Sequence, residues 1–157
     1  MAGRTDRAAR TIAAPRDAIY RALIDPELLL RWLPPEGMAG RFEAFDARPG
    51  GHYRLILRYL DSSAGKTGTG EDVVEGRFVS FIPGLQVVQS ADFESGDPAF
   101  AGTMTIDWTL RDTPDGTEVL VECRDVPSGI SAEDHAAGLA SSLENLAALL
   151  EEPGANA

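Results

Sequence analysis

Between residues 41 and 124, apolar side chains recur at about every second position, and clusters rich in glycine, proline or aspartate interrupt the alternation. A period of two places successive side chains on opposite faces of a β-strand. The pattern therefore predicts consecutive antiparallel strands in a sheet with one buried and one solvated face. The predicted strands cover residues 41–47, 52–60, 72–82, 85–94, 103–111 and 117–124.

The strand over residues 52–60 indicates which face is buried. Its apolar face carries Tyr53, Leu55, Leu57 and Tyr59, and its polar face carries His52, Arg54 and Arg58. The strand over 72–82 leaves both choices open, because two apolar sets compete for the interior: Val74, Gly76 and Phe78 against Val73, Val79 and Phe81. Glu75 and Arg77 are accordingly either a polar pair at an inner wall or part of an outer charge pattern.

Two short helices are predicted before the sheet, after a strand over residues 7–13. Pro15 suits the first position of a helix, where a missing N–H costs nothing. Asp25 and Pro26 then begin a second helix, which runs to Trp32 and ends before a pair of prolines.

A longer helix is predicted at the C-terminus. Ser131 and Asp134 resemble a capping box, and apolar residues then follow a helical period as far as Leu150. About 20 residues make a helix of roughly 30 Å, enough to cross a sheet. A long helix on a one-sided antiparallel sheet is an α+β arrangement.

Composition narrows the class of protein. The chain has 157 residues, 43% of them hydrophobic, which predicts one domain over 1–157 with a core at about 7–152. A net charge of −11 argues against nucleic acid and anionic membranes as partners. Apolar segments are too short to span a bilayer, and the N-terminus lacks the apolar core of a secretion signal, so we expect a cytoplasmic protein.

The catalytic and metal-binding motifs that the sequence partly matches are incomplete. Gly65-Lys66-Thr67 ends like a phosphate-binding loop, but Leu60 stands where that motif needs glycine. The two histidines and one cysteine lack the paired spacing of a metal site, so no metal is expected. Cys123 is predicted to be an inert core residue and His52 a surface residue, and residues 61–70 are predicted to form a mobile hairpin loop.

Four segments resemble a known family: APRDAIYRALIDPELLLRWLPPEGM, RFEAFDARPGG, DVVEGRFVSFIPG and VPSGISAEDHAAGLASSLENLAALLE. Together they are similar to the bacterial form of the activator of heat-shock protein 90 ATPase family, within the START-like (SRPBCC) superfamily. The resemblance implies a helix-grip fold, in which a curved antiparallel sheet wraps around the long C-terminal helix, with two short helices after the first strand. It also implies a deep cavity between sheet and helix.

The function expected from this cavity is the binding of a small hydrophobic or aromatic molecule, without a cofactor or a catalytic residue. The candidate ligand-binding residues are Trp32, Met38, Tyr53, Tyr59, Asp72, Gln89, Phe93, Met104, Trp108, His135 and Leu139. Gln89 stands out as a polar group on an apolar strand face, which must find a partner.

His135 has two interpretations, as a hydrogen-bonding or acid-base group at the cavity mouth or as a helix-surface residue bonded to a nearby loop. Gly138 costs a helix about 1 kcal/mol relative to alanine, which suggests close approach of the sheet, a loop or a ligand.

Alternative functions remain open at this point. One is a polyketide cyclase or aromatase-like enzyme in which His135, Asp72 or an arginine transfers protons inside the same cavity. Another, implied by the family name, is regulation of a chaperone ATPase through the outer surface. A homodimer is also possible, because the edge of the sheet near the N-terminal strand can pair with a second copy.

Overall fold

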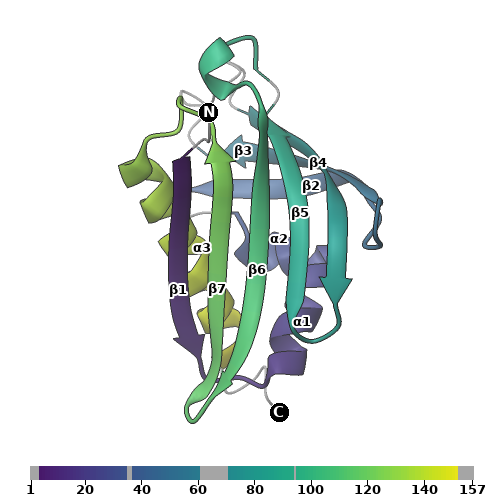
Figure 1. Cartoon of the computed structure of the whole chain (residues 1–157), viewed down its shortest axis with the longest axis vertical. Helices are drawn as coiled ribbons and strands as arrows, with labels where there is room; N and C mark the ends of the chain where they lie inside the picture. Colours follow the sequence, from purple (N-terminus) through teal and green to yellow (C-terminus); the bar gives the residue numbers. More distant parts are fainter. Residues whose placement is uncertain (1–3, 35–36, 61–70, 94, 152–157) are drawn as a thin grey trace.

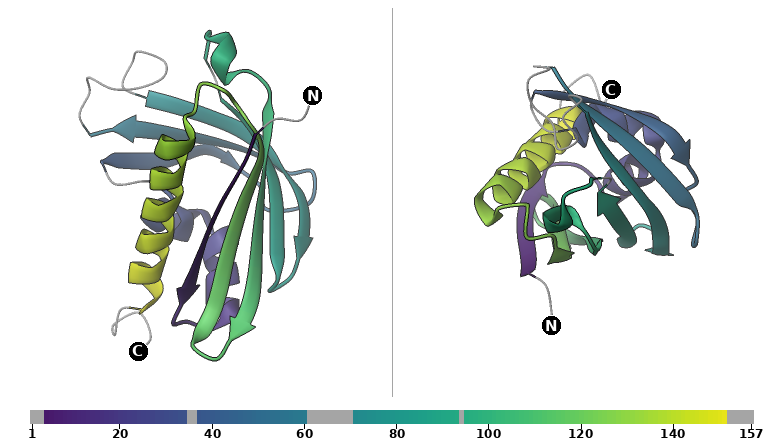
Figure 2. Two further views of the ribbon diagram at one scale, coloured as in Figure 1. Left: turned by 60° about the vertical axis from the view of Figure 1, so that its left-hand side comes forward. Right: turned by 90° about the horizontal axis from the view of Figure 1, so that it is seen from above.

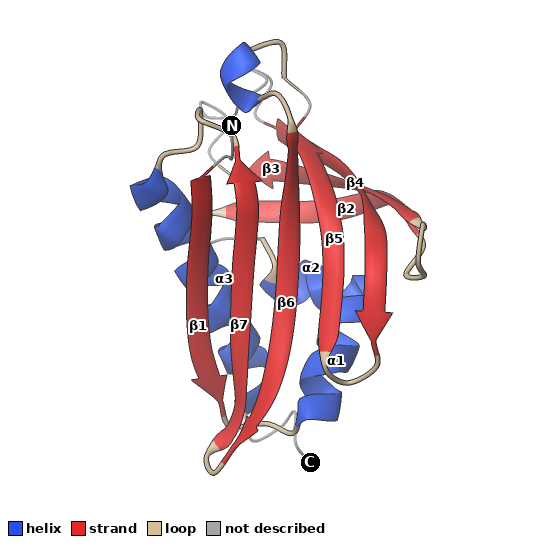
Figure 3. Ribbon diagram, viewed as in Figure 1, coloured by secondary structure: helices blue, strands red, loops and turns tan. Residues whose placement is uncertain are grey.

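A seven-stranded antiparallel sheet forms the body of the protein, in the strand order β1-β7-β6-β5-β4-β3-β2 (Figures 1 and 3). The computed structural model describes residues 4–34, 37–60, 71–93 and 95–151, so the predicted loop over 61–70 lies outside the described residues. The elements in chain order are β1 (Arg4–Ile12), α1 (Arg16–Ile24), α2 (Pro26–Trp32), β2 (Met38–Phe45), β3 (His52–Tyr59), β4 (Glu71–Ile82), β5 (Gln86–Phe93), the 3-10 turn η1 (Pro98–Phe100), β6 (Thr103–Thr113), β7 (Gly116–Val126) and α3 (Ala132–Glu151).

The sheet is strongly curved. β1, β7, β6 and β5 run along the long axis of the molecule, whereas β2 and β3 cross it (Figure 1). The helices α1, α2 and α3 lie on the concave side, and α3 stands beside β1 (Figure 2). This arrangement confirms the predicted α+β helix-grip fold, with two short helices after the first strand.

Two predicted boundaries near the N-terminus were wrong. β1 begins at Arg4 rather than at residue 7, because Arg4 already pairs with Val126 of β7. Pro15 precedes α1 as its cap instead of being its first residue, with φ −69° and ψ 150°. The proline ring restricts φ to a value that suits both helix and extended chain, so the sequence could not distinguish these positions.

The other two helices begin as predicted. The Asp25 side chain accepts hydrogen bonds from the backbone N–H groups of Glu27 and Leu28, at 2.9 and 3.4 Å. The Ser131 hydroxyl oxygen accepts one from the Asp134 N–H at 3.0 Å. Each cap satisfies N–H groups that have no partner inside the first turn of a helix.

A β-bulge explains why the facing of β4 was ambiguous. Val74, Gly76 and Phe78 occupy the inner face, but the register with β5 shifts between Phe78 and Ser80. An extra residue reverses the alternation. Phe81 therefore also packs inward, with its ring centroid 5.3 Å from that of Phe78, whereas Val79 is exposed.

Glu75 consequently lies on the outer face of the sheet. Its carboxylate accepts a 2.8 Å hydrogen bond from Arg54 Nη1, and His52 Nε2 lies 3.7 Å away. Arg77 is exposed on the same face. These residues form an outer charge pattern rather than part of the inner wall.

The most deeply buried part of the core lies where α1, α2 and α3 meet the sheet. Trp32 is completely buried, and its indole N–H donates to the Ala22 carbonyl at 2.9 Å. On α3, the buried Ser142 hydroxyl donates to the Leu33 carbonyl at 2.7 Å. Two residues that the helical apolar period assigned to the buried side of α3, Ala136 and Ala140, are exposed instead.

Candidate functional site

A cavity of about 470 Å³ lies between the concave face of the sheet and α3. Much of its wall is apolar and comes from strands β2 to β6. The side chains there include Phe42, Leu55, Val74, Phe78, Ala91 and Ile106. Cavities that bind small molecules are mostly apolar, with a few placed polar groups that fix orientation.

The structure brings most of the predicted site residues to this wall, where their role in ligand binding stays a prediction. Those that line the cavity are Met38, Tyr53, Tyr59, Asp72, Gln89, Phe93, Met104, Trp108, His135 and Leu139. Trp32 does not line it. It packs behind Trp108, edge to face, with ring centroids 5.4 Å apart, and so supports the wall from within the core.

Tyr53 is the first of the polar groups on the wall. Its hydroxyl donates a 2.5 Å hydrogen bond to the backbone carbonyl of Ser90 on β5. Burial raises the pKa of Tyr53 to about 12, a rise that a side-chain hydrogen bond with Gln89 opposes. Gln89 thus has a partner within the protein, as its place on an apolar face requires.

A second polar group lies where β3 and β4 meet. The Tyr59 hydroxyl donates to Asp72 Oδ2 at 3.0 Å, and Asp72 is only 4% exposed. Burial, together with the hydrogen bond and charge of Asp72, raises the pKa of Tyr59 to about 12. The phenol therefore stays protonated at neutral pH and remains a donor to the carboxylate.

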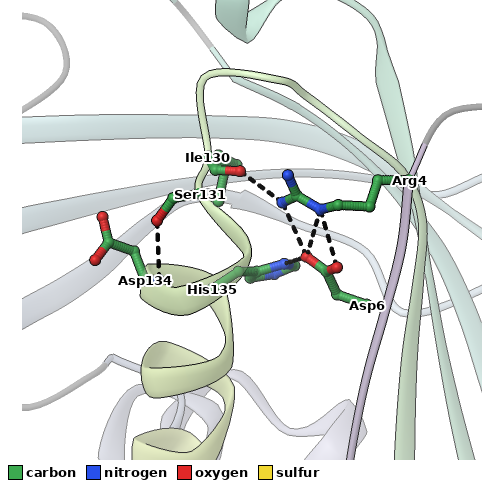
Figure 4. A network of polar contacts seen from close by, with 6 residues as sticks. All are labelled: Arg4, Asp6, Ile130, Ser131, Asp134 and His135. Carbon is green, nitrogen blue, oxygen red and sulfur yellow. Dashed lines mark hydrogen bonds and ion pairs between the residues drawn. The ribbon is translucent and has the colours of Figure 1, made fainter.

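The third group joins α3 to β1 (Figure 4). His135 Nδ1 lies 2.7 Å from Asp6 Oδ2, and Arg4 binds the same carboxylate with Nε–Oδ1 and Nη2–Oδ2 distances of 3.0 Å each. The Arg4 guanidinium, more than any other group, lowers the pKa of Asp6. Arg4 Nη2 also donates to the Ile130 carbonyl at 2.5 Å.

This network combines the two interpretations of His135. The imidazole is bonded to the protein, but to a strand rather than a loop, and the residue also lines the cavity. Sequence reasoning missed Asp6 and Arg4 altogether. Asp6 is 129 positions away from His135, and no local pattern relates a charged residue near the N-terminus to a helix so distant in the chain.

The close approach of protein predicted at Gly138 is absent. A Cβ atom built there would have no atom of the described residues within 4 Å beyond the backbone of α3 itself, and the residue lies on the cavity wall. Of the three explanations offered for this glycine, the sheet and the loops are therefore wrong, and space for a ligand is the one that remains. Sequence alone could not distinguish them, because a missing side chain signals space without showing what fills it.

The other chemistry-bearing residues lie away from the cavity. Cys123 is 1% exposed, and burial raises its pKa to about 12. The side chain of His52 is 48% exposed on the outer face. No group of histidine, cysteine, aspartate or glutamate in the described residues is arranged to hold a metal ion. None of the described helices combines the length and apolarity that crossing a membrane requires.

A curved antiparallel sheet, a long C-terminal helix and a cavity between them define the START-like class of helix-grip proteins. Residues 13–151 match the model of the Activator of Hsp90 ATPase homolog 1-like protein family. The chain belongs to that family. No curated protein matches it in sequence.

Solved structures agree with this assignment. A protein from Chromobacterium violaceum is 31% identical, with 94% of this chain and 97% of that chain covered and a TM-score of 0.85. A family member from Silicibacter pomeroyi is 20% identical, with 94% and 98% covered and a TM-score of 0.77. A protein of the dynemicin biosynthetic locus, 21% identical over 94% of this chain and 47% of that chain, shares the fold at a TM-score of 0.69.

Proposed function

We propose that this protein binds a small, mainly apolar or aromatic molecule in the cavity between the sheet and α3. The observation that carries the proposal is the cavity itself, about 470 Å³ of space with a largely apolar wall. Protein interiors are close-packed, so a space of this size costs stability unless it is used. The proposal includes no cofactor and no metal.

The polar groups on the wall fit the same function. Tyr53 with Gln89, Tyr59 with Asp72, and His135 with Asp6 each form an internally bonded pair. Groups held in this way keep fixed positions without a ligand, so a bound molecule meets a preorganised site and loses little affinity to side-chain ordering.

The first test is native mass spectrometry of the purified protein, followed by denaturation and identification of any small molecule released. Thermal stabilisation by a panel of lipids and aromatic metabolites extends the search to ligands lost in purification. A retained apolar molecule, or stabilisation by one class of compound, supports the proposal. An empty protein that no compound stabilises contradicts it.

A pair of variants at Gly138 shows whether binding takes place in this cavity. Gly138→Trp places a large side chain into open space at the wall and should abolish binding, whereas Gly138→Ala should preserve it. Both variants replace the same helical glycine, so a difference between them reports the volume of the side chain. Equal binding by both would place the ligand elsewhere.

The Asp6–His135 pair favours a second candidate, a proton-transfer enzyme that acts on the bound molecule, such as a polyketide cyclase or aromatase. A carboxylate that orients an imidazole is the arrangement of a general base. The probe 5-nitrobenzisoxazole tests it: a base removes the carbon-bound proton, the N–O bond breaks, and a phenolate is released. A rate above buffer that His135→Phe abolishes supports catalysis, and a rate that survives this substitution contradicts it.

Regulation of a chaperone ATPase, which the family name suggests, is a proposal about the outer surface. The Gly138→Trp variant distinguishes it from ligand binding in the cavity: a surface regulator should stimulate a purified Hsp90-type ATPase equally well with or without this substitution.

Homodimerisation through the β1 edge of the sheet is likewise a proposal. Sedimentation of the purified protein tests it.

A further inference from the structure

The first two turns of α3 place an imidazole and a glycine, with open space over it, on one face of the helix. His135 and Gly138 are three residues apart, a spacing that places them side by side on a helix. Both line the cavity, whereas Ala136 and Ala137 between them are exposed. The helix therefore turns its one histidine and its one glycine toward the same interior space.

Within the described residues, the imidazole is hydrogen-bonded through one of its two nitrogens only. Its Nδ1 is 2.7 Å from Asp6 Oδ2, and the side chains of His135 and Asp6 are 13% and 12% exposed. An ionised carboxylate only accepts hydrogen bonds, so Nδ1 must carry the hydrogen. In the neutral ring this arrangement leaves the lone pair on Nε2, which becomes a hydrogen-bond acceptor.

This second nitrogen is available to a molecule in the cavity. Nε2 makes no hydrogen bond to residues 4–34, 37–60, 71–93 or 95–151, although His135 is part of the wall. A polar atom beside an apolar cavity is costly unless a water or a ligand group pairs with it. The open space over Gly138 lies one turn along the helix and leaves room for the body of such a molecule.

The charges around His135 determine which kind of ligand group fits. Asp6 lies against its Nδ1, and the exposed Asp134 also lines the cavity. Among the described residues, the Arg4 guanidinium beside Asp6 already donates to Asp6 and to the Ile130 carbonyl. A ligand carboxylate would meet like charges here. A neutral hydroxyl avoids this repulsion and supplies the donor that Nε2 needs.

We propose that His135 Nε2 and the space over Gly138 form a polar subsite that accepts a hydrogen bond from the hydroxyl group of an otherwise apolar ligand, an alcohol or a phenol. Asp6 acts as a positioning residue, because it fixes the imidazole without touching the ligand. This inference depends on the proposed function and adds the chemical class of the ligand to it.

The test compares 2-naphthol with 2-methoxynaphthalene, which differ only in the donor hydrogen and a methyl group. Titration calorimetry should show 2-naphthol binding roughly three- to tenfold more tightly, the worth of one hydrogen bond. His135→Phe keeps a ring and removes the acceptor, so it should abolish that preference while 2-methoxynaphthalene binds as before. Equal affinities for the two probes in the unmodified protein would overturn the proposal.

The second histidine provides a matched control. His52→Phe removes an imidazole from the outer face of the sheet and should leave the preference for 2-naphthol intact. Asp6→Asn should weaken the preference, because an amide can accept from or donate to Nδ1 and no longer selects one tautomer. A preference for 2-naphthol that survives His135→Phe contradicts the role of His135 as the acceptor. A preference that is unchanged in Asp6→Asn contradicts the role of Asp6 as the positioning residue.

A measurement without substitution guards against a variant that fails to fold. The chain has two histidines, so selective ¹⁵N-histidine labelling gives a spectrum in which each ring can be assigned. 2-Naphthol should shift the Nε2 resonance of His135 and leave that of His52 unchanged, and an unmoved His135 resonance overturns the proposal. If neither probe binds and no compound of the wider panel stabilises the protein, the proposed cavity function itself fails, whereas equal binding of both probes refutes only the subsite.

Discussion

The Tyr53 hydroxyl on β3 reaches past β4 to the backbone carbonyl of Ser90 on β5, at 2.5 Å. Gly76 makes this possible. It pairs with Tyr53 in the β3–β4 register, and a Cβ atom there would lie 2.7 Å from the hydroxyl oxygen and 2.8 Å from the ring. The Ser90 hydroxyl oxygen in turn accepts from the Arg77 N–H at 3.1 Å. At this point, therefore, side-chain hydroxyl groups bond with the backbone groups of β4 and β5.

Gly76→Ala should destabilise the protein by about 1–3 kcal/mol, the usual cost of overpacking a filled site. The added methyl group meets both the Ser90 carbonyl and the Tyr53 ring, and neither can retreat without breaking the hydrogen bond between them. Urea unfolding followed by circular dichroism measures the change. A midpoint equal to that of the unmodified protein would show that the strands separate here at no cost.

Gly138→Ala should have the opposite effect and stabilise the fold by about 0.5–1 kcal/mol. The new methyl group meets nothing within 4 Å, and alanine loses less backbone entropy than glycine when the helix forms. The same urea titration tests it. A loss of stability would mean that the wall of the cavity closes around this position in solution.

The Asp6 network should make stability depend on pH. The folded protein holds the pKa of Asp6 below its ordinary 3.8, mainly through Arg4, so the unfolded chain binds this proton more readily. The resulting stabilisation is fully present above the ordinary pKa and disappears as pH falls through the lowered one.

Asp6→Asn removes this contribution. The difference in unfolding free energy between the two proteins should shrink as the pH falls below about 4. Urea unfolding across that range measures it. A difference that grows on acidification would mean that folding raises the pKa of Asp6 instead of lowering it.

Trp108 should report ligand binding by fluorescence. The chain has two tryptophans, of which Trp108 lines the cavity and Trp32 is buried behind it. An apolar ligand should change the emission of the unmodified protein, and Trp108→Phe should remove most of that change. If the signal persists in Trp108→Phe, the ligand acts on the environment of Trp32 instead.

Cys123 should be unreactive in the native protein. It is 1% exposed, and burial, followed by the charges of Asp6 and Glu122, raises the pKa of its thiol to about 12, so almost no thiolate is present at neutral pH. Modification by a thiol-specific disulfide reagent should be slow in buffer and complete within minutes in concentrated urea. Rapid modification in buffer would indicate that β7 opens locally.

The order of elements and most inner faces were predictable, because each depends on neighbours along the chain. The alternation of Tyr53, Leu55, Leu57 and Tyr59 assigned β3 to the wall before any contact was known. The caps at Asp25 and Ser131 were local as well. The resemblance to the family supplied the cavity itself, which periodicity alone does not contain.

Tertiary structure decided what depends on distant segments. Only the fold shows that Asp6 orients His135, that Trp32 stands behind Trp108 instead of on the wall, and that the space over Gly138 is open. Only the register of β4 against β5 reveals the bulge that turns both Phe78 and Phe81 inward. Periodicity reports the two sides of one strand or helix, whereas these relationships arise from the curvature of the sheet and from the position of α3 against it.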